Sequence, residues 1–176
     1  RSNELMAHTY THLWGLQTVG LRFFTVYGPW GRPDMAYWSF LENIRHKEPI
    51  KVFNYGKHMR DFTYIDDIIQ GVSAALFSQK LDPYEIINLG NNKPVELMEF
   101  INTLEELSGQ KATLQMVEPQ PGDVVATYAD ISKAAAKLDF QPGTQLKEGL
   151  SSFVRWFNEH TQLVEEVRGF REFSAS

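Results

Sequence analysis

Residues 21–36 read LRFFTVYGPWGRPDMA. The first part of this stretch is an apolar run typical of a strand buried in a parallel sheet. It leads directly into a loop in which two glycines, two prolines and an arginine fall within six residues. Such a loop presents rigid backbone and selected side chains to a ligand. The stretch therefore predicts an α/β fold with a binding loop after one of its strands.

The sequence on either side continues the α/β pattern. Apolar residues at helical spacing predict helices over residues 2–14, 36–47, 68–77, 95–108, 132–138 and 147–161. Short apolar runs predict strands over residues 18–24, 50–53, 62–65, 85–89 and 113–117. The charged tail, residues 164–176, is expected to fray.

The composition excludes several functional classes. The chain has 176 residues, a formal net charge of -5 and no cysteine. An acidic chain is a poor binder of nucleic acid, whose affinity depends on clustered Lys and Arg, although small anions remain possible ligands. Without cysteine there are no disulfides, zinc thiolates or thiol nucleophiles, which is compatible with a cytoplasmic protein. No apolar run reaches the roughly 18 residues that a membrane span needs, so no membrane association is expected.

Two arginines lie in contexts that suggest anion binding. Arg32 is held between a glycine and a proline, and Arg60 is followed by an apolar stretch. The guanidinium group forms two parallel hydrogen bonds with a carboxylate or phosphate, which suits both residues to bind an anionic ligand. The alternative for each is a local ion pair, with Asp34 for Arg32 and with Asp61 for Arg60.

Other polar residues have ordinary structural explanations. Asp66 and Asp67 could bind a metal ion or act as a proton-shuttling pair, but their position at the start of a helical pattern favours capping of the helix and a favourable interaction with its dipole. His8 and His12 could share a zinc ion, but no further ligand follows at a suitable spacing, which favours ordinary helix residues. Asp123 follows Pro-Gly and is typical of a turn.

Three catalytic signatures are absent from residues 1–176. The sequence has no glycine-rich phosphate-binding motif, no Tyr-x-x-x-Lys and no Gly-x-Ser-x-Gly. From its residues alone, the chain has anion-binding arginines and aromatic side chains but no convincing acid, base or nucleophile.

Five motifs in order along the chain carry a family resemblance. They are residues 4–8 (ELMAH), 21–36, 60–67 (RDFTYIDD), 87–90 (INLG), and 120–123 (QPGD) with 128–130 (YAD). In this order they resemble the C-terminal half of the extended short-chain dehydrogenases/reductases of the NAD-dependent epimerase/dehydratase family, and most closely the UDP-glucuronate 4-epimerases. The resemblance covers nearly the whole chain.

The resemblance implies a division of the chain into two parts. Residues 1–35 are expected to be a remnant of the NAD-binding Rossmann domain, a helix and a strand with the substrate loop. Residues 36–176 are expected to form mainly the nucleotide-sugar substrate-binding domain. In the family, NAD is held by a glycine fingerprint near the N-terminus, and a Tyr-x-x-x-Lys pair carries the chemistry. Both are expected upstream of Arg1, so no catalytic residue is expected in this chain, and the fragment alone is expected to be inactive. Its isolated helix and strand should expose apolar faces.

The resemblance also implies roles for individual residues. Phe24 is expected to face the nicotinamide, and Thr25 and Arg32 are expected to hold the sugar carboxylate. Val52 and Phe53 correspond to the strand beside the uracil, Arg60 to the diphosphate clamp, and Asp123 to a ribose or phosphate contact. Related glucose and galactose epimerases carry an additional arginine at the position of Gln120, so a second diphosphate arginine is not expected here.

The full protein is then expected to be a cytoplasmic enzyme of polysaccharide biosynthesis. The family oxidises C4 of a UDP-sugar with bound NAD, rotates the 4-keto sugar and returns the hydride to its other face. A homodimer is expected, with a UDP-sugar as substrate and with neither nucleic acid nor a membrane as partner. The alternatives are a UDP-hexose epimerase, a sugar-nucleotide dehydratase or decarboxylase of the same family, or a stand-alone sugar-nucleotide binding module.

Overall fold

Helices and short parallel strands alternate along the chain, as the sequence predicts. The computed structural model describes residues 1–119 and 122–175, which form two compact units. Unit 1 consists of residues 1–26, 60–94 and 126–144, and unit 2 consists of residues 27–59, 95–125 and 145–176. Three short strands form a sheet of order β2-β4-β6: β2 (Thr25–Tyr27), β4 (Met59–Tyr64) and β6 (Pro94–Glu96). Three of the five points at which the chain passes from one unit to the other lie within these strands.

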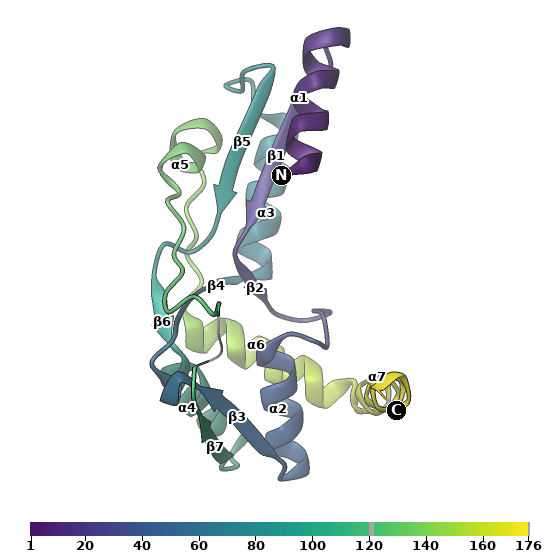
Figure 1. The fold of residues 1–176 in the computed structure, drawn as a ribbon, viewed down its shortest axis with the longest axis vertical. Coiled ribbons are helices and arrows are strands. Elements are labelled where there is room, and N and C mark those ends of the chain that lie inside the picture. The colour runs from purple at the N-terminus through teal and green to yellow at the C-terminus, as the bar shows by residue number, and fades with distance from the viewer. Residues whose placement is uncertain (120–121, 176) are drawn as a thin grey trace. The chain divides into compact units, whose positions relative to one another are not determined.

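Unit 1 is built on a parallel pair of strands (Figure 1). In this pair, β1 (Thr18–Phe23) lies beside β5 (Tyr84–Leu89), with Thr18 opposite Tyr84 and Phe23 opposite Leu89. Its helices are α1 (Ser2–Trp14), α3 (Ile65–Phe77) and α5 (Ser132–Leu138). The core of this unit contains Ile68, Ile87, Leu89, Ala134, Leu138 and Phe140. Burial of these apolar side chains is the main force that holds α3 and α5 against the strands.

Unit 2 contains a second parallel pair and four helices. The strands are β3 (Pro49–Phe53) and β7 (Thr113–Val117), and a short 3-10 turn, Asn54–Gly56, follows β3. The helices are α2 (Ala36–His46), α4 (Leu97–Ser108), α6 (Leu146–Glu159) and α7 (Thr161–Ala175). Aromatic side chains of α2 and α6 pack edge to face at the centre: Tyr37, Trp38, Phe153, Trp156 and Phe157.

Glycines end two helices at the predicted positions. Gly15 follows α1 with φ 66°, and Gly109 follows α4 with φ 69°. In this left-handed conformation a glycine has no Cβ penalty, and its N–H bonds a carbonyl that the helix leaves unpaired.

Asp66 and Asp67 do not cap α3, so the capping prediction is wrong, but both lie in its first turn, where their charge complements the helix dipole as predicted. The helix begins at Ile65, and the residue before it, Tyr64, makes no side-chain cap bond. The Asp67 carboxylate instead accepts hydrogen bonds from the N–H groups of Gly143 (3.2 Å) and Thr144 (3.1 Å). The carboxylate therefore fixes the loop after α5.

Two further sequence predictions need correction. Residues 95 and 96 belong to strand β6 rather than to the helix that follows. Residues 164–175 of the tail are helical rather than frayed, because α7 runs from Thr161 to Ala175, and residue 176 lies outside the described residues. Val164 is fully buried, and Arg168 and Arg171 form ion pairs with Glu48 and Glu42. These long-range contacts stabilise a helix that the charged composition does not predict.

The apolar surfaces of α1 are exposed, as predicted for this chain. None of its residues is buried, and Leu5, Met6, Leu13 and Trp14 are each at least 60% exposed. Strand β1 is only half-buried, although its apolar sequence is typical of a strand covered on both faces. Such an uncovered apolar surface favours association with other protein.

No helix within the described residues is long and apolar enough to cross a membrane.

The division at residue 35 into a Rossmann remnant and a substrate domain stays a prediction. The two compact units are each assembled from three separated segments, and residues 60–94 lie in the same unit as β1.

Candidate functional site

The carboxyl ends of β1 and β5 bring Phe24 beside a glycine. The N–H of Phe24 bonds the carbonyl of Leu89 at 3.4 Å. A Cβ atom at Gly90 would lie 3.3 Å from the Phe24 ring and only 2.4 Å from the Cβ of Ala129. A larger residue at position 90 would therefore displace its neighbours. Ligands of parallel α/β sheets bind at the carboxyl ends of strands, which is where the half-buried Phe24 ring lies.

Asp61, which local sequence context indicates only as a partner of Arg60, is a buried carboxylate. Its side chain is 0% exposed, and its oxygens accept hydrogen bonds from the backbone N–H groups of Asn91 (2.7 Å), Asn92 (2.9 Å) and Ala129 (2.7 Å). These bonds tie β4 to the loop after β5. A carboxylate that is buried must form hydrogen bonds or ion pairs. The position of Asp61 beside apolar residues is therefore the feature of the sequence that could have indicated its role in holding the backbone.

The hydrogen bonds of Asp61 also fix the backbone of its neighbour Arg60. Arg60 is half-buried in β4, one residue before the carboxylate that fixes the strand. Thr25 is also half-buried and begins β2. Both residues belong to unit 1, as does Phe24.

The loop after β2 is fixed by Tyr37. A Cβ atom at Gly31 would lie 1.6 Å from the Tyr37 hydroxyl oxygen, so position 31 accepts only glycine in this conformation. Burial raises the pKa of Tyr37 to about 12, while a hydrogen bond with the Arg32 backbone opposes the rise. The backbone from which the Arg32 side chain extends is thus held by a buried aromatic residue.

Arg32 forms the local ion pair that the sequence analysis gave as its alternative. Its Nε donates to Oδ1 of Asp34 at 3.0 Å, and its Nη2 donates to Oδ2. This hydrogen-bonded pair raises the pKa of Arg32 and lowers the pKa of Asp34. Both side chains are largely exposed, so the pair can open at little cost. The geometry is the two-pronged arrangement by which arginine binds any carboxylate.

Strand β3 presents Val52 and Phe53 differently. Val52 is 0% exposed, whereas Phe53 is half-buried. A ligand beside this strand can therefore touch the Phe53 side chain, but it can reach Val52 only through the backbone.

Asp123 lies near His58, a buried histidine that no sequence motif indicates. Its Oδ2 is 3.4 Å from Nδ1 of His58, which is 4% exposed. The backbone on both sides of His58 is also bound, since the His58 carbonyl accepts from the N–H of Leu97 and Met59 donates to the carbonyl of Val125. Gln120, at which a second arginine is not expected, lies outside the described residues.

The candidate residues fall into two sets. Phe24, Thr25 and Arg60 lie in unit 1, and Arg32, Val52, Phe53 and Asp123 lie in unit 2.

In the part of the chain that the structure describes, no group of three or more His, Cys, Asp or Glu side chains could hold a metal ion. His8 packs edge to face against Tyr84, with ring centroids 5.0 Å apart.

A family model described as the NAD dependent epimerase/dehydratase family matches residues 1–90, half of the chain. An uncharacterized protein of Methanocaldococcus jannaschii is 51% identical over 91% of this chain and 48% of its own length. A UDP-glucuronate 4-epimerase of Thermodesulfobacterium geofontis is 45% identical over 94% of this chain and 50% of its own length. The chain thus spans about half the length of the curated relatives it matches.

A solved structure is similar to this chain in fold as well as in sequence. The crystal structure of UDP-glucuronic acid 4-epimerase from Bacillus cereus in complex with UDP-glucuronic acid and NAD has a TM-score of 0.84 and 38% identity to this chain. The match covers 90% of this chain and 50% of that one. The α/β fold predicted from the sequence is therefore confirmed.

Proposed function

Because this chain belongs to the NAD dependent epimerase/dehydratase family, we propose that the whole protein is an epimerase that inverts C4 of UDP-glucuronate. The observation that carries the proposal is the 45% identity to a UDP-glucuronate 4-epimerase over 94% of the chain. The likeness to a crystal structure that contains UDP-glucuronic acid and NAD supports the same substrate. The other activities of the family use the same fold, so the substrate has to be argued from the residues.

The proposed contribution of this chain to the NAD site is Phe24. Its half-buried ring follows the end of β1 and lies beside Gly90, and the flat apolar face fits a nicotinamide ring. The sequence has no glycine-rich loop for the cofactor diphosphate, which in this proposal is held by residues outside this chain. When bound, NAD supplies the removal and return of hydride at C4.

Arg32 and Thr25 have a chemical reason to bind the sugar carboxylate. A ketone at C4 makes the sugar a β-keto acid, because the carboxylate is on C5. Such an acid loses CO₂ when the bond from C5 to the carboxyl carbon aligns with the carbonyl π system, since the electron pair of that bond then enters an enolate. A two-pronged arginine together with a hydroxyl would hold the carboxylate away from this alignment.

Arg32 would exchange one carboxylate for another when substrate binds. Its partner in the structure, Asp34, has a largely exposed side chain, so the exchange costs little. In the same proposal Val52 and Phe53 border the uracil, Val52 through its backbone, while Arg60 binds the diphosphate. Asp123 contacts the ribose or its phosphate.

The test measures products of the full-length protein with UDP-glucuronate. Arg32→Ala should raise the ratio of UDP-pentose to epimer and raise the KM for UDP-glucuronate by about tenfold, since it removes a charge-assisted pair. Asp34→Asn should lower the KM for UDP-glucuronate, because it releases Arg32 from its local partner. Arg155→Ala, an exposed arginine of α6, is the matched control and should change neither quantity.

The outcomes separate the alternatives. An unchanged product ratio in Arg32→Ala would remove the proposed role of Arg32. Turnover of UDP-glucose or UDP-galactose without turnover of UDP-glucuronate would make the protein a UDP-hexose epimerase. A keto-deoxy sugar or a pentose as the main product of the unmodified protein would indicate a dehydratase or a decarboxylase. Binding of UDP-sugars without turnover would indicate a binding module.

A further inference from the structure

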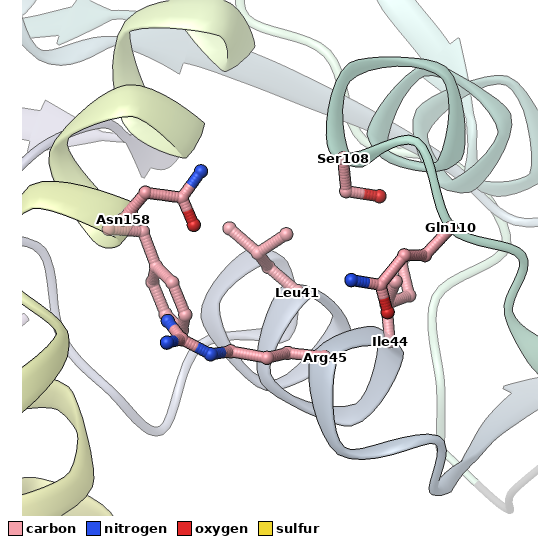
Figure 2. Close-up of a pocket in the computed structure, with 7 residues that line it drawn as sticks. Leu41, Ile44, Arg45, Ser108, Gln110 and Asn158 are labelled. Carbon is pink, nitrogen blue, oxygen red and sulfur yellow. The ribbon is translucent and has the colours of Figure 1, made fainter.

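A separate cavity of about 210 Å³ lies within unit 2, between α2, the end of α4 and α6 (Figure 2). None of the residues considered above for the UDP-sugar lines it. Its base is apolar, because Leu41 and Ile44 are almost fully buried there. The volume is several times the roughly 30 Å³ that one water molecule occupies in the liquid, so the cavity has room for a small organic ligand.

Arg45 lines the cavity without a carboxylate partner among the described residues. Its Nη2 donates to the hydroxyl of Thr161 at 3.1 Å, and its Nη1 is buried with no acceptor. The guanidinium carbon lies 6.0 Å from the centre of the Phe157 ring, which holds the side chain in place. By contrast, four other arginines donate to carboxylates: Arg22, Arg32, Arg168 and Arg171.

Three uncharged polar side chains also line the cavity. Figure 2 shows the amides of Gln110 and Asn158 and the hydroxyl of Ser108 arranged around Leu41. The Ser108 hydroxyl makes only a long bond of 3.4 Å, to the Glu105 carbonyl. The Gln110 and Asn158 amide groups form no side-chain hydrogen bond within residues 1–119 and 122–171, so their N–H donors are available to a ligand.

The rim of the cavity is basic. Arg45 and Gln110 also line a neighbouring opening together with Lys47, Lys111 and Thr113, and neither lining contains an acidic side chain. Lys111 itself is paired with Glu105, which leaves Arg45 and Lys47 as the charges that act on a ligand. In a chain of net charge -5, this local excess of positive charge favours an anion.

We propose that this cavity binds the carboxylate of a short aliphatic acid. The guanidinium fork and the two amides would donate to the planar carboxylate, and Leu41 and Ile44 would cover the hydrocarbon chain. Inorganic phosphate would satisfy the same donors but would leave the apolar base uncovered, so the cavity should prefer the acid.

The test titrates butyrate against the full-length protein by saturation-transfer difference NMR, with butyramide as the neutral analogue of equal shape. Butyrate should give a saturable signal and butyramide should bind at least about tenfold more weakly, because the charge-assisted bonds are lost. Arg45→Gln should weaken butyrate binding by a similar factor. Arg155→Gln removes an exposed charge of α6 outside the cavity and should leave binding unchanged.

Two further variants make the result specific. Arg32→Ala should not affect butyrate binding, which separates this cavity from the proposed carboxylate contact of the sugar. Gln110→Ala alters an exposed residue after α4 that the fold tolerates, and it should weaken butyrate binding if the cavity is the site. Equal binding of butyramide, no saturable signal, or displacement of butyrate by lower concentrations of phosphate would each overturn the proposal.

Discussion

Three buried carboxylates of unit 1 act on the backbone around them. Asp61 binds backbone N–H groups of two separate segments, and Asp67 binds those of the loop after α5. Glu85 is paired with Lys133 and Lys137 of α5. Because a buried charge without partners is costly, each of these residues fixes the position of the segment that it binds.

Asp61→Asn should lower the free energy of unfolding by about 2–3 kcal/mol. Asparagine replaces one acceptor oxygen with an NH₂ group, so at least one of the three backbone N–H groups would lose its acceptor. Urea unfolding followed by circular dichroism measures the change. Asp66→Asn, an exposed neighbour, is the control and should stay within about 0.5 kcal/mol of the unmodified protein. Equal effects of the two substitutions would contradict a special role for Asp61.

Glu85 should make stability depend on pH in the acid range. The hydrogen bond with Lys133, aided by Lys137, lowers the pKa of Glu85 from 4.5 to about 2. A lowered pKa stabilises the fold above about pH 4.5, and this stabilisation is lost as the pH falls from 4.5 toward 2.

Glu85→Gln should therefore destabilise the protein by roughly 2 kcal/mol at pH 7, allowing for the half-exposed Lys133, and by much less at pH 3. Urea unfolding at several pH values tests this difference. Glu96→Gln, at an exposed position, should show no such trend. A destabilisation by Glu85→Gln that does not vary with pH would show that the effect is not due to the charge.

Local sequence context indicates the partner of Arg32 but not the backbone partners of Asp61. For Arg32 the alternative was a pair with Asp34 two residues away, and the structure contains that pair. The two carboxylate oxygens of Asp61 instead accept hydrogen bonds from backbone N–H groups about 30 and 68 residues away in the sequence. Such partners depend on the tertiary fold and cannot be read from neighbouring residues.

The loop after β2 depends on one close contact, between Gly31 and Tyr37. Gly31→Ala would place a Cβ atom 1.6 Å from the Tyr37 hydroxyl oxygen and 2.8 Å from its ring carbon Cζ. We expect a loss of about 1–3 kcal/mol from this overpacking.

Tyr37→Phe in the same protein removes the oxygen but keeps the ring. The double variant should therefore be less destabilised than the sum of the single variants, by about 1 kcal/mol. Thermal unfolding of the four proteins measures the coupling. Gly143→Ala is the control, because nothing lies within 4 Å of an added Cβ there. Strictly additive effects would contradict the contact.

Most helices and strands follow from local pattern, and the exceptions have physical causes. Helix α5 has the predicted bounds, Ser132–Leu138, and α1 ends before Gly15 as expected. The three-residue strand β6 is too short to show an alternating pattern. Helix α7 has a charged sequence, and its position depends on two ion pairs. Arg171 pairs with Glu42 of α2, and Arg168 pairs with Glu48, which follows α2. A single sequence shows the charges but not their partners.

The segments of the two units alternate along the chain. Unit 1 needs β1 from the first segment, β5 from the second and α5 from the third. The core residues Ile87 and Leu89 of β5 pack with Val19 and Leu21 of β1. A division at residue 35 would therefore separate strands that share one core.

A fragment of residues 36–176 tests this argument. It keeps β5 but lacks β1, so Ile87 and Leu89 would lose part of their apolar cover, and the N–H groups of β5 would lose their bonding partners. We expect the β5 amides to exchange with solvent at least about 100-fold faster than in the 176-residue chain, because partial loss of a core costs several kcal/mol. Amides of α6, which belong to unit 2, serve as the internal reference. Native-like protection of β5 in the fragment would instead favour an independent domain that begins at residue 36.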